Sequence, residues 1–169
     1  MRAVTLSFSF TLLVLSSTLG CASGEPLTGT WTQPNATTQL PPSLGGGILN
    51  VNATLLGSSP RAFDMTLALE TLGLTDTIRL RGTYVQAGTD LTLELSGFVI
   101  DPASMNTSRV SATGEQCIVL MGFAGTEVCF PTPQTHPYSV SGNTLTMTLD
   151  HEIAGAATSQ THFALTRSP

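Results

Sequence analysis

"FDMTLALE", residues 63–70, alternates apolar and smaller or polar side chains without interruption. Phe63, Met65, Leu67 and Leu69 share one parity, as expected for a β-strand with one buried face and one wetter face. The same alternation recurs in further stretches: 78–84, 91–95, 145–149 and 163–165. Helical spacing is weak along the whole chain. The sequence therefore predicts an all-β protein.

Two similar stretches predict hairpins. "YVQAGTDLTLEL" begins at Tyr84 and "YSVSGNTLTMTL" at Tyr138. Each reads as strand, tight turn and strand, with turns at 87–90 and 141–144, where Gly or Asn supplies a positive φ. Duplication and convergent hairpin chemistry explain the likeness equally well. Repeated hairpins build antiparallel up-and-down barrels, so we predict a barrel of about eight to ten strands, with a β-sandwich as the alternative.

Two long segments break the alternation. Residues 33–47, "QPNATTQLPPSLGGG", follow the first expected strand, and residues 101–115, "DPASMNTSRVSATGE", lie in mid-chain. Loops of this length in a compact domain are usually functional or mobile. Both segments are expected to be irregular.

The two ends of the domain carry short motifs. Gly29-Thr30-Trp31 begins it, "GTY" at residues 82–84 precedes one hairpin, and "FALTR" ends at Arg167. These motifs resemble those of the lipocalin and calycin-like barrels, and the chain is similar to a divergent member over residues 27–167. The resemblance implies that Arg167 packs over Trp31 where first and last strands meet, a contact that contributes about 0.5 to 2 kcal/mol.

The resemblance also implies a cup with apolar side chains pointing inward and residues 33–47 as its lid. The residues expected to point inward are Met65, Leu67, Leu80, Leu93, Met147 and Phe163. They either line a ligand pocket or simply fill a small barrel. An apolar cavity of roughly 300 to 1,000 Å³ favours a ligand, and a solid interior favours a structural or interaction role.

The N-terminus looks like an export signal. Arg2 precedes an apolar run, residues 3–15, that has the length of a signal-peptide core and is too short to span a bilayer. Ser17-Thr18-Leu19-Gly20-Cys21 resembles the lipobox of bacterial lipoproteins, which implies a diacylglyceryl group on Cys21. The alternative is an ordinary secretory signal, with Cys21 in a disulfide. The expected organisation is a signal peptide (1–20), a lipidated tether (21–26) and a barrel domain (27–167).

The export signal and lipobox predict a protein of the cell envelope that is held to a membrane by several acyl chains, which together make a stable anchor. Ala22, rather than Asp, follows the cysteine, which by family analogy implies the outer membrane where the source has two membranes. The chain has six arginines, no lysine and eleven acidic residues. An acidic chain with scattered arginines argues against a nucleic-acid partner, because phosphate contacts need clustered positive charge.

Cys117 and Cys129 are expected to form a disulfide, because exported proteins meet an oxidising compartment. A turn centred on Phe123 pairs Leu120 with Thr126 and so Cys117 with Cys129. Closing a loop of this size contributes roughly 3 kcal/mol in the chain-entropy view. Two buried free thiols are the alternative.

Residues with catalytic or metal-binding spacing are sparse. "HEIAG" at His151 begins like His-Glu-x-x-His, but Gly155 stands where the second histidine belongs. His136, His151 and His162 are expected to be ordinary surface or core residues. We therefore expect no enzyme, metal or cofactor. The leading hypothesis is a lipid-anchored protein that binds a small apolar ligand, and the alternative is an envelope lipoprotein with a filled barrel and a structural or interaction role.

Overall fold

The computed structural model describes residues 27–36, 48–57, 61–71, 74–153, 155 and 157–169. Their strands form one sheet, and every strand pair in it is antiparallel. The first five strands are β1 (Gly29–Ala36), β2 (Ile48–Leu56), β3 (Ala62–Thr71), β4 (Leu74–Ala87) and β5 (Asp90–Phe98). The middle of the chain forms β6 (Thr107–Val110), β7 (Gln116–Leu120), the 3-10 turn η2 (Met121–Phe123) and β8 (Thr126–Phe130). The remaining strands are β9 (Gln134–Pro137), β10 (Ser139–Ser141), β11 (Thr144–Ile153) and β12 (Ser159–Arg167).

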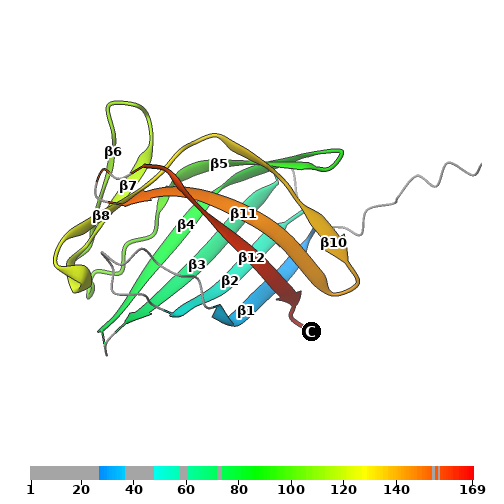
Figure 1. Ribbon diagram of the computed structural model, residues 1–169, viewed down its shortest axis with the longest axis horizontal. Helices are drawn as coiled ribbons and strands as arrows, with labels where there is room; N and C mark the ends of the chain where they lie inside the picture. Colours follow the sequence, from blue (N-terminus) through cyan, green and yellow to red (C-terminus); the bar gives the residue numbers. More distant parts are fainter. Residues whose placement is uncertain (1–26, 37–47, 58–60, 72–73, 154, 156) are drawn as a thin grey trace, which may run out of the picture.

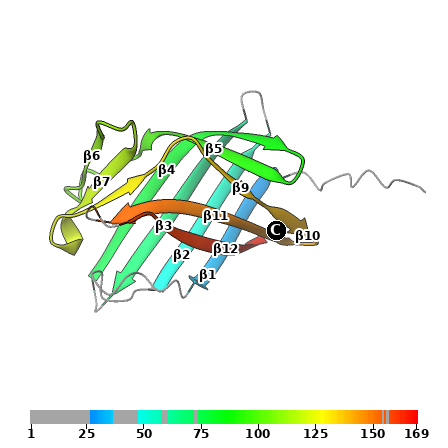
Figure 2. The same cartoon turned by 45° about the horizontal axis from the view of Figure 1, so that its top comes forward.

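The long strands follow one another around the sheet. β1 to β5 form a meander, β11 pairs with β12, and β12 returns to pair with β1. Figures 1 and 2 show β1 to β5 as one curved wall, with β11 and β12 crossing opposite it. Their inward residues are the alternating apolar ones, because successive side chains of a strand point to opposite faces.

One chain segment, residues 126–141, closes the sheet. Its β9 pairs with β5, placing His136 opposite Leu91, and its β10 pairs with β11, placing Val140 opposite Leu145. At the other end of β11, β8 places Val128 opposite Ile153. Since the segment pairs with both β5 and β11, it occupies the eighth strand position of a barrel whose other seven strands are β1 to β5, β11 and β12. The predicted up-and-down barrel is confirmed over the sandwich.

Between β8 and β10, a side chain replaces backbone pairing along β11. The amide of Asp150 donates to Gln134 Oε1 at 2.6 Å, and Gln134 Nε2 lies 3.4 Å from the Asp150 carbonyl oxygen. His136 Nε2 lies 3.1 Å from the Asp150 carboxylate. Gln134 and His136 therefore connect β9 to β11 where the two strands diverge. We call this junction the seam.

Both predicted hairpin turns are confirmed. Ala87 pairs with Asp90 around Gly88 (φ 61°), and Ser141 pairs with Thr144 around Gly142 (φ 56°). The similar hairpins β4–β5 and β10–β11 lie on the two sides of the seam.

The two segments expected to be irregular contain more strand than predicted. β1 continues to Ala36, with a register shift between Gln33 and Ala36, and residues 37–47 lie outside the described residues. In the second segment, β6 pairs with β7. All four β6 residues are exposed, so no alternation marks them. With such short strands included, the described sheet has twelve strands rather than eight to ten.

The predicted disulfide is confirmed and joins β7 to β8. We call β6, β7 and β8 together the arm. Cys117 and Cys129 lie opposite each other with their Cα atoms 4.0 Å apart, and Leu120 pairs with Thr126 across η2. On the arm, Arg109 donates to both carboxylate oxygens of Glu127, at 2.7 and 2.8 Å.

Gly82 occupies a position where β4 and β5 approach closely, at the register shift between Arg81 and Gly82. A Cβ here would collide with the carbonyl oxygen of Glu94 and lie 2.7 Å from the ring of Phe63. We expect Gly82→Ala to destabilise the barrel by about 1–3 kcal/mol, the usual cost of overpacking. Urea unfolding measures the change. Val85→Ala, on an exposed side of the same strand, is the control, and equal midpoints for the two variants would contradict the close approach.

Candidate functional site at the barrel mouth

One end of the barrel is sealed by Trp31. Its ring is fully buried, and Nε1 donates to the Leu27 carbonyl oxygen at 2.8 Å. Arg167 lies opposite Trp31 in the β1–β12 pairing, with its guanidinium carbon 4.5 Å from the ring centroid. The predicted cation–π contact is therefore present where the first and last strands meet. We call this end the closed end.

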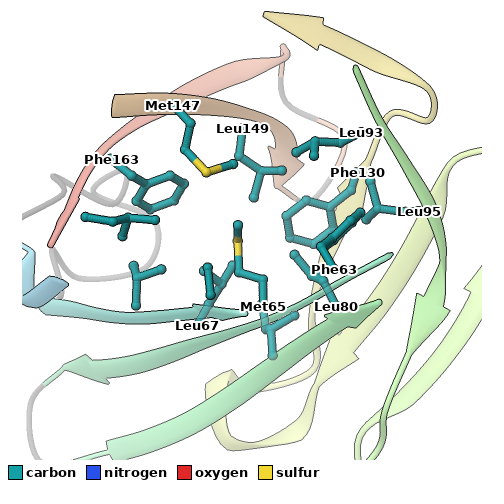
Figure 3. Packing of buried hydrophobic residues seen from close by; sticks show 14 of the residues in the cluster. Phe63, Met65, Leu67, Leu80, Leu93, Leu95, Phe130, Met147, Leu149 and Phe163 are labelled. Atoms are coloured by element: carbon teal, nitrogen blue, oxygen red, sulfur yellow. The ribbon is translucent and has the colours of Figure 1, made fainter. Parts of the chain in front are cut away.

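The residues predicted to point inward are all buried: Met65, Leu67, Leu80, Leu93, Met147 and Phe163. Figure 3 shows them converging with the labelled Leu149, Phe63 and Phe130 from opposite walls of the barrel. They belong to one continuous apolar core. The structure therefore places these side chains in the core, packed against one another.

A cavity lies toward the other end, where β3 passes to β4 and β11 passes to β12, which we call the mouth. Its volume is about 30 Å³. Its lining residues are Leu67, Leu69, Ile78, Val128, Phe130, Leu149, His151, Ile153, Thr161 and Phe163. This volume is about that of one water molecule, whereas pockets that hold drug-sized ligands measure roughly 300 to 1,000 Å³. Only Leu67 and Phe163 among the predicted lining residues reach this cavity.

Two polar side chains lie on the cavity wall. His151 and Thr161 are both buried and have the inward parity of their strands. Burial lowers the pKa of His151, since desolvation disfavours the imidazolium, so the ring is neutral at pH 7. A neutral imidazole and a hydroxyl can exchange hydrogen bonds with an uncharged polar group. Because neither side chain is charged, neither can form an ion pair with a buried charged ligand.

A polar clamp holds the arm against the rim of the mouth. Asn106 Nδ2 donates to Asp76 Oδ1 at 2.7 Å, and the amide of Met121 donates to Asn106 Oδ1 at 2.8 Å. Both side chains of the clamp are buried. Sequence reasoning missed this clamp, although one signal was present: Asp76 has the inward parity of Ile78 and Leu80.

The other candidate residues are dispersed. Cys21 lies outside the described residues. His151 lies at the mouth, His136 at the seam, and His162 on the outer face with its Nδ1 2.9 Å from Thr148 Oγ1. Across the described ranges, Cys117, Glu127 and Cys129 have ligand atoms close enough for a metal, but the two sulfurs are bonded to each other.

No protein-family model, curated protein or solved structure matches the chain. Within the described part of the chain, no helix has the length and apolar character needed to cross a membrane.

The closed end makes a quantitative prediction. Trp31→Ala should destabilise the protein by about 3 to 5 kcal/mol, as expected for a large buried aromatic side chain. Arg167→Ala should cost less, and most of its effect should vanish when Trp31 is absent. Urea unfolding of the two single variants and the double variant gives the coupling, expected at about 0.5 to 2 kcal/mol. Strictly additive effects would show that the stacking contact contributes nothing.

The lowered pKa of His151 predicts a pH dependence of stability. Below about pH 6.5 the unfolded chain binds a proton at this histidine, while the folded chain keeps it neutral. The free energy of unfolding should therefore fall as the pH falls through about 6.5, and should be at its full value above that pH. Urea titrations at several pH values should show a shallower fall for His151→Gln than for the wild type. His162→Gln is the exposed control, and an unchanged slope for His151→Gln would refute the assignment.

Proposed function

We propose that this protein is an envelope lipoprotein whose filled barrel serves as a rigid scaffold and acts through its surface. The observation that carries the proposal is the packed interior, with a cavity of only about 30 Å³ at the mouth. An interior so small leaves no room for a drug-sized ligand without displacement of core side chains. The rim of the mouth and the arm then become the surfaces available to a partner.

The proposed anchor is a lipid on Cys21. The residues 21–26 between this cysteine and Leu27 span at most about 20 Å when extended. Leu27 accepts the hydrogen bond from Trp31 at the closed end, so a taut tether would direct the closed end toward the membrane and the mouth away from it. The proposed location is the outer membrane where the source has two membranes. No catalytic role is proposed.

The proposed relationship is to the lipocalin and calycin-like barrels, as a divergent member. Two features support it: the meander closes into a barrel with eight strand positions, and Arg167 stacks on Trp31 at the closed end. Eight-stranded barrels of this size have interiors that side chains can fill.

A second candidate function is binding of a small apolar ligand at the mouth. The cavity there is lined mainly by apolar side chains, with His151 and Thr161 as the two polar groups. Deeper in the core, Met65 and Met147 are unbranched and flexible, so they can be displaced more readily than branched residues. This candidate requires the core to open, whereas the scaffold function requires no rearrangement.

The anchor and the filled interior can be tested on one preparation. In the source organism, the wild-type protein should carry fatty-acid label and sediment with membranes, and Cys21→Ser should be unlabelled and soluble. Ser23→Ala is the matched control and should behave as the wild type. Label on Cys21→Ser would refute the anchor.

Native mass spectrometry of the wild-type protein, purified from its own membrane, tests the interior. The scaffold function predicts the mass of residues 21–169 with their covalent lipid and no further adduct. A stoichiometric apolar adduct that dissociates on activation would instead establish the ligand-binding function.

A further inference from the structure

The outer side of the seam contains a hollow of about 240 Å³. Pro137, Ser139, Thr146, Thr148 and His162 are among its lining residues, and none of the lining residues carries a carboxylate or a guanidinium. Figure 2 shows β10 beside β11, and the segment before β10 bending away from β11. The hollow lies where the two parts of the chain separate.

Strand pairing is interrupted at this hollow. On this side of β11, pairing stops at Thr146 opposite Ser139 and resumes at Glu152 opposite Cys129. Residues 147–151 therefore have no strand partner on this side among the described residues. In an antiparallel sheet, the N–H and C=O of one residue point to the same side, and the side alternates along the strand. Thr148 consequently directs both groups into the seam, as Asp150 does.

Gln134 shows what can pair with such a backbone. Its side-chain amide accepts from the Asp150 N–H at 2.6 Å, and its Nε2 lies 3.4 Å from the Asp150 carbonyl oxygen. At Asp150 a side chain thus takes the place of a strand. At Thr148 no side chain of the described residues is bonded to the backbone in this way. The seam therefore presents a backbone donor and acceptor side by side, next to the hollow.

Neutral polar side chains surround this backbone. Ser139 Oγ and Thr146 Oγ1 are 3.0 Å apart, and Thr148 Oγ1 lies 2.9 Å from His162 Nδ1. A hydroxyl can donate one hydrogen bond and accept two, so these contacts use only part of its capacity. The remaining capacity can serve a ligand that both donates and accepts.

The neutral surface continues from the hollow around the barrel. One row of side chains crosses β11, β12, β1, β2 and β3, each opposite the next: Thr144, Thr166, Thr32, Asn52 and Thr66. All five are exposed or half-buried, and neighbouring strands are about 4.8 Å apart. Threonine side chains are stiff at χ1, so they lose little conformational entropy on binding. A ligand longer than the hollow would meet further hydroxyl and amide groups.

We infer that the hollow at the seam binds a neutral saccharide, with two adjacent hydroxyls of a sugar ring on the Thr148 backbone. Adjacent hydroxyls present a donor and an acceptor side by side, as the Gln134 amide does at Asp150. Because the lining has no guanidinium and the Asp150 carboxylate is nearby, an anionic ligand is disfavoured. The pyrrolidine ring of Pro137 offers an apolar contact for the C–H groups of the sugar.

The size of the interruption favours a sugar over a peptide. Ser139 and Gln134 close the gap within a few residues of each other, which suits a compact ring and leaves no room for an added strand. The inference rests on the proposed function, because a surface-acting envelope protein meets envelope glycans. It adds the outer side of the seam to the surfaces through which the barrel acts.

Hydrogen exchange and NMR titration of the isotope-labelled full-length protein test the site. In the free protein, the Thr148 amide should exchange faster than the Asp150 amide, which donates to Gln134. Cellotetraose, a neutral probe with adjacent hydroxyls on every ring, should slow exchange at Thr148 and shift its resonance to saturation. Fully O-methylated cellotetraose keeps the rings and the linkage but has no hydroxyl to donate, so it should bind at least about tenfold more weakly.

A variant that fills the hollow supplies the second test. Ser139→Trp, at an exposed position of β10, should raise the dissociation constant for cellotetraose at least about tenfold. Val85→Trp, at an exposed position of β4, is the matched control and should bind as the wild type does. Backbone proton contacts between Val140 and Leu145 verify in each variant that β10 stays paired.

Three results would overturn the inference: a Thr148 amide already protected in the free protein, equal binding of the two tetrasaccharides, or cellotetraose binding that survives Ser139→Trp. Absence of any binding would also overturn it, while leaving the anchor and the filled interior unaffected. Saturable shifts at Met65 and Met147 in place of Thr148 would put the sugar in the core and contradict the filled interior as well.

Discussion

The structure depends on one constraint: residues 126–141 must pair with β5 and β11 at the same time. The segment meets this constraint with three short strands: β9 pairs with β5, while β10 and β8 pair with the two ends of β11. The register along β11 shifts between Cys129 opposite Glu152 and Val140 opposite Leu145, and Gln134 supplies hydrogen bonds to Asp150 in between. Without this closure, the alternating strands would have no common interior.

Closure also determines how much space the interior offers. A barrel with eight strand positions encloses a volume that side chains can fill. Met65, Met147 and Phe163 fill it from opposing walls. Trp31 and Arg167 seal the closed end, while the mouth keeps a cavity the size of one water molecule. The physical consequence is a rigid barrel in which the groups free to contact other molecules lie on the outer surface. This is why we favour a scaffold over a ligand carrier.

The features that were predictable from sequence are those with local signals. Alternation located β3, β4, β5, β11 and the end of β12, though not β2; Gly88 and Gly142 located the hairpin turns, and symmetry about Phe123 gave the Cys117–Cys129 pairing. The missed features depend on neighbours distant in sequence. β6 has no buried face to create a pattern, and Asp76 and Asn106 form a clamp only because the arm folds back onto the rim. The size of the cavity likewise could not be predicted from the sequence, because it depends on how side chains from opposing walls of the barrel pack.

The most direct test of the closed barrel is an NMR measurement of interstrand contacts on the two sides of the seam. The structure predicts backbone proton contacts between Leu91 and His136, and also between Val140 and Leu145. It further predicts slow hydrogen exchange at the amide of Asp150, which donates to Gln134. Both sets of contacts in one molecule establish that residues 126–141 close the barrel. Contacts on only one side, with fast exchange at Asp150, would mean an open sheet and would contradict the account.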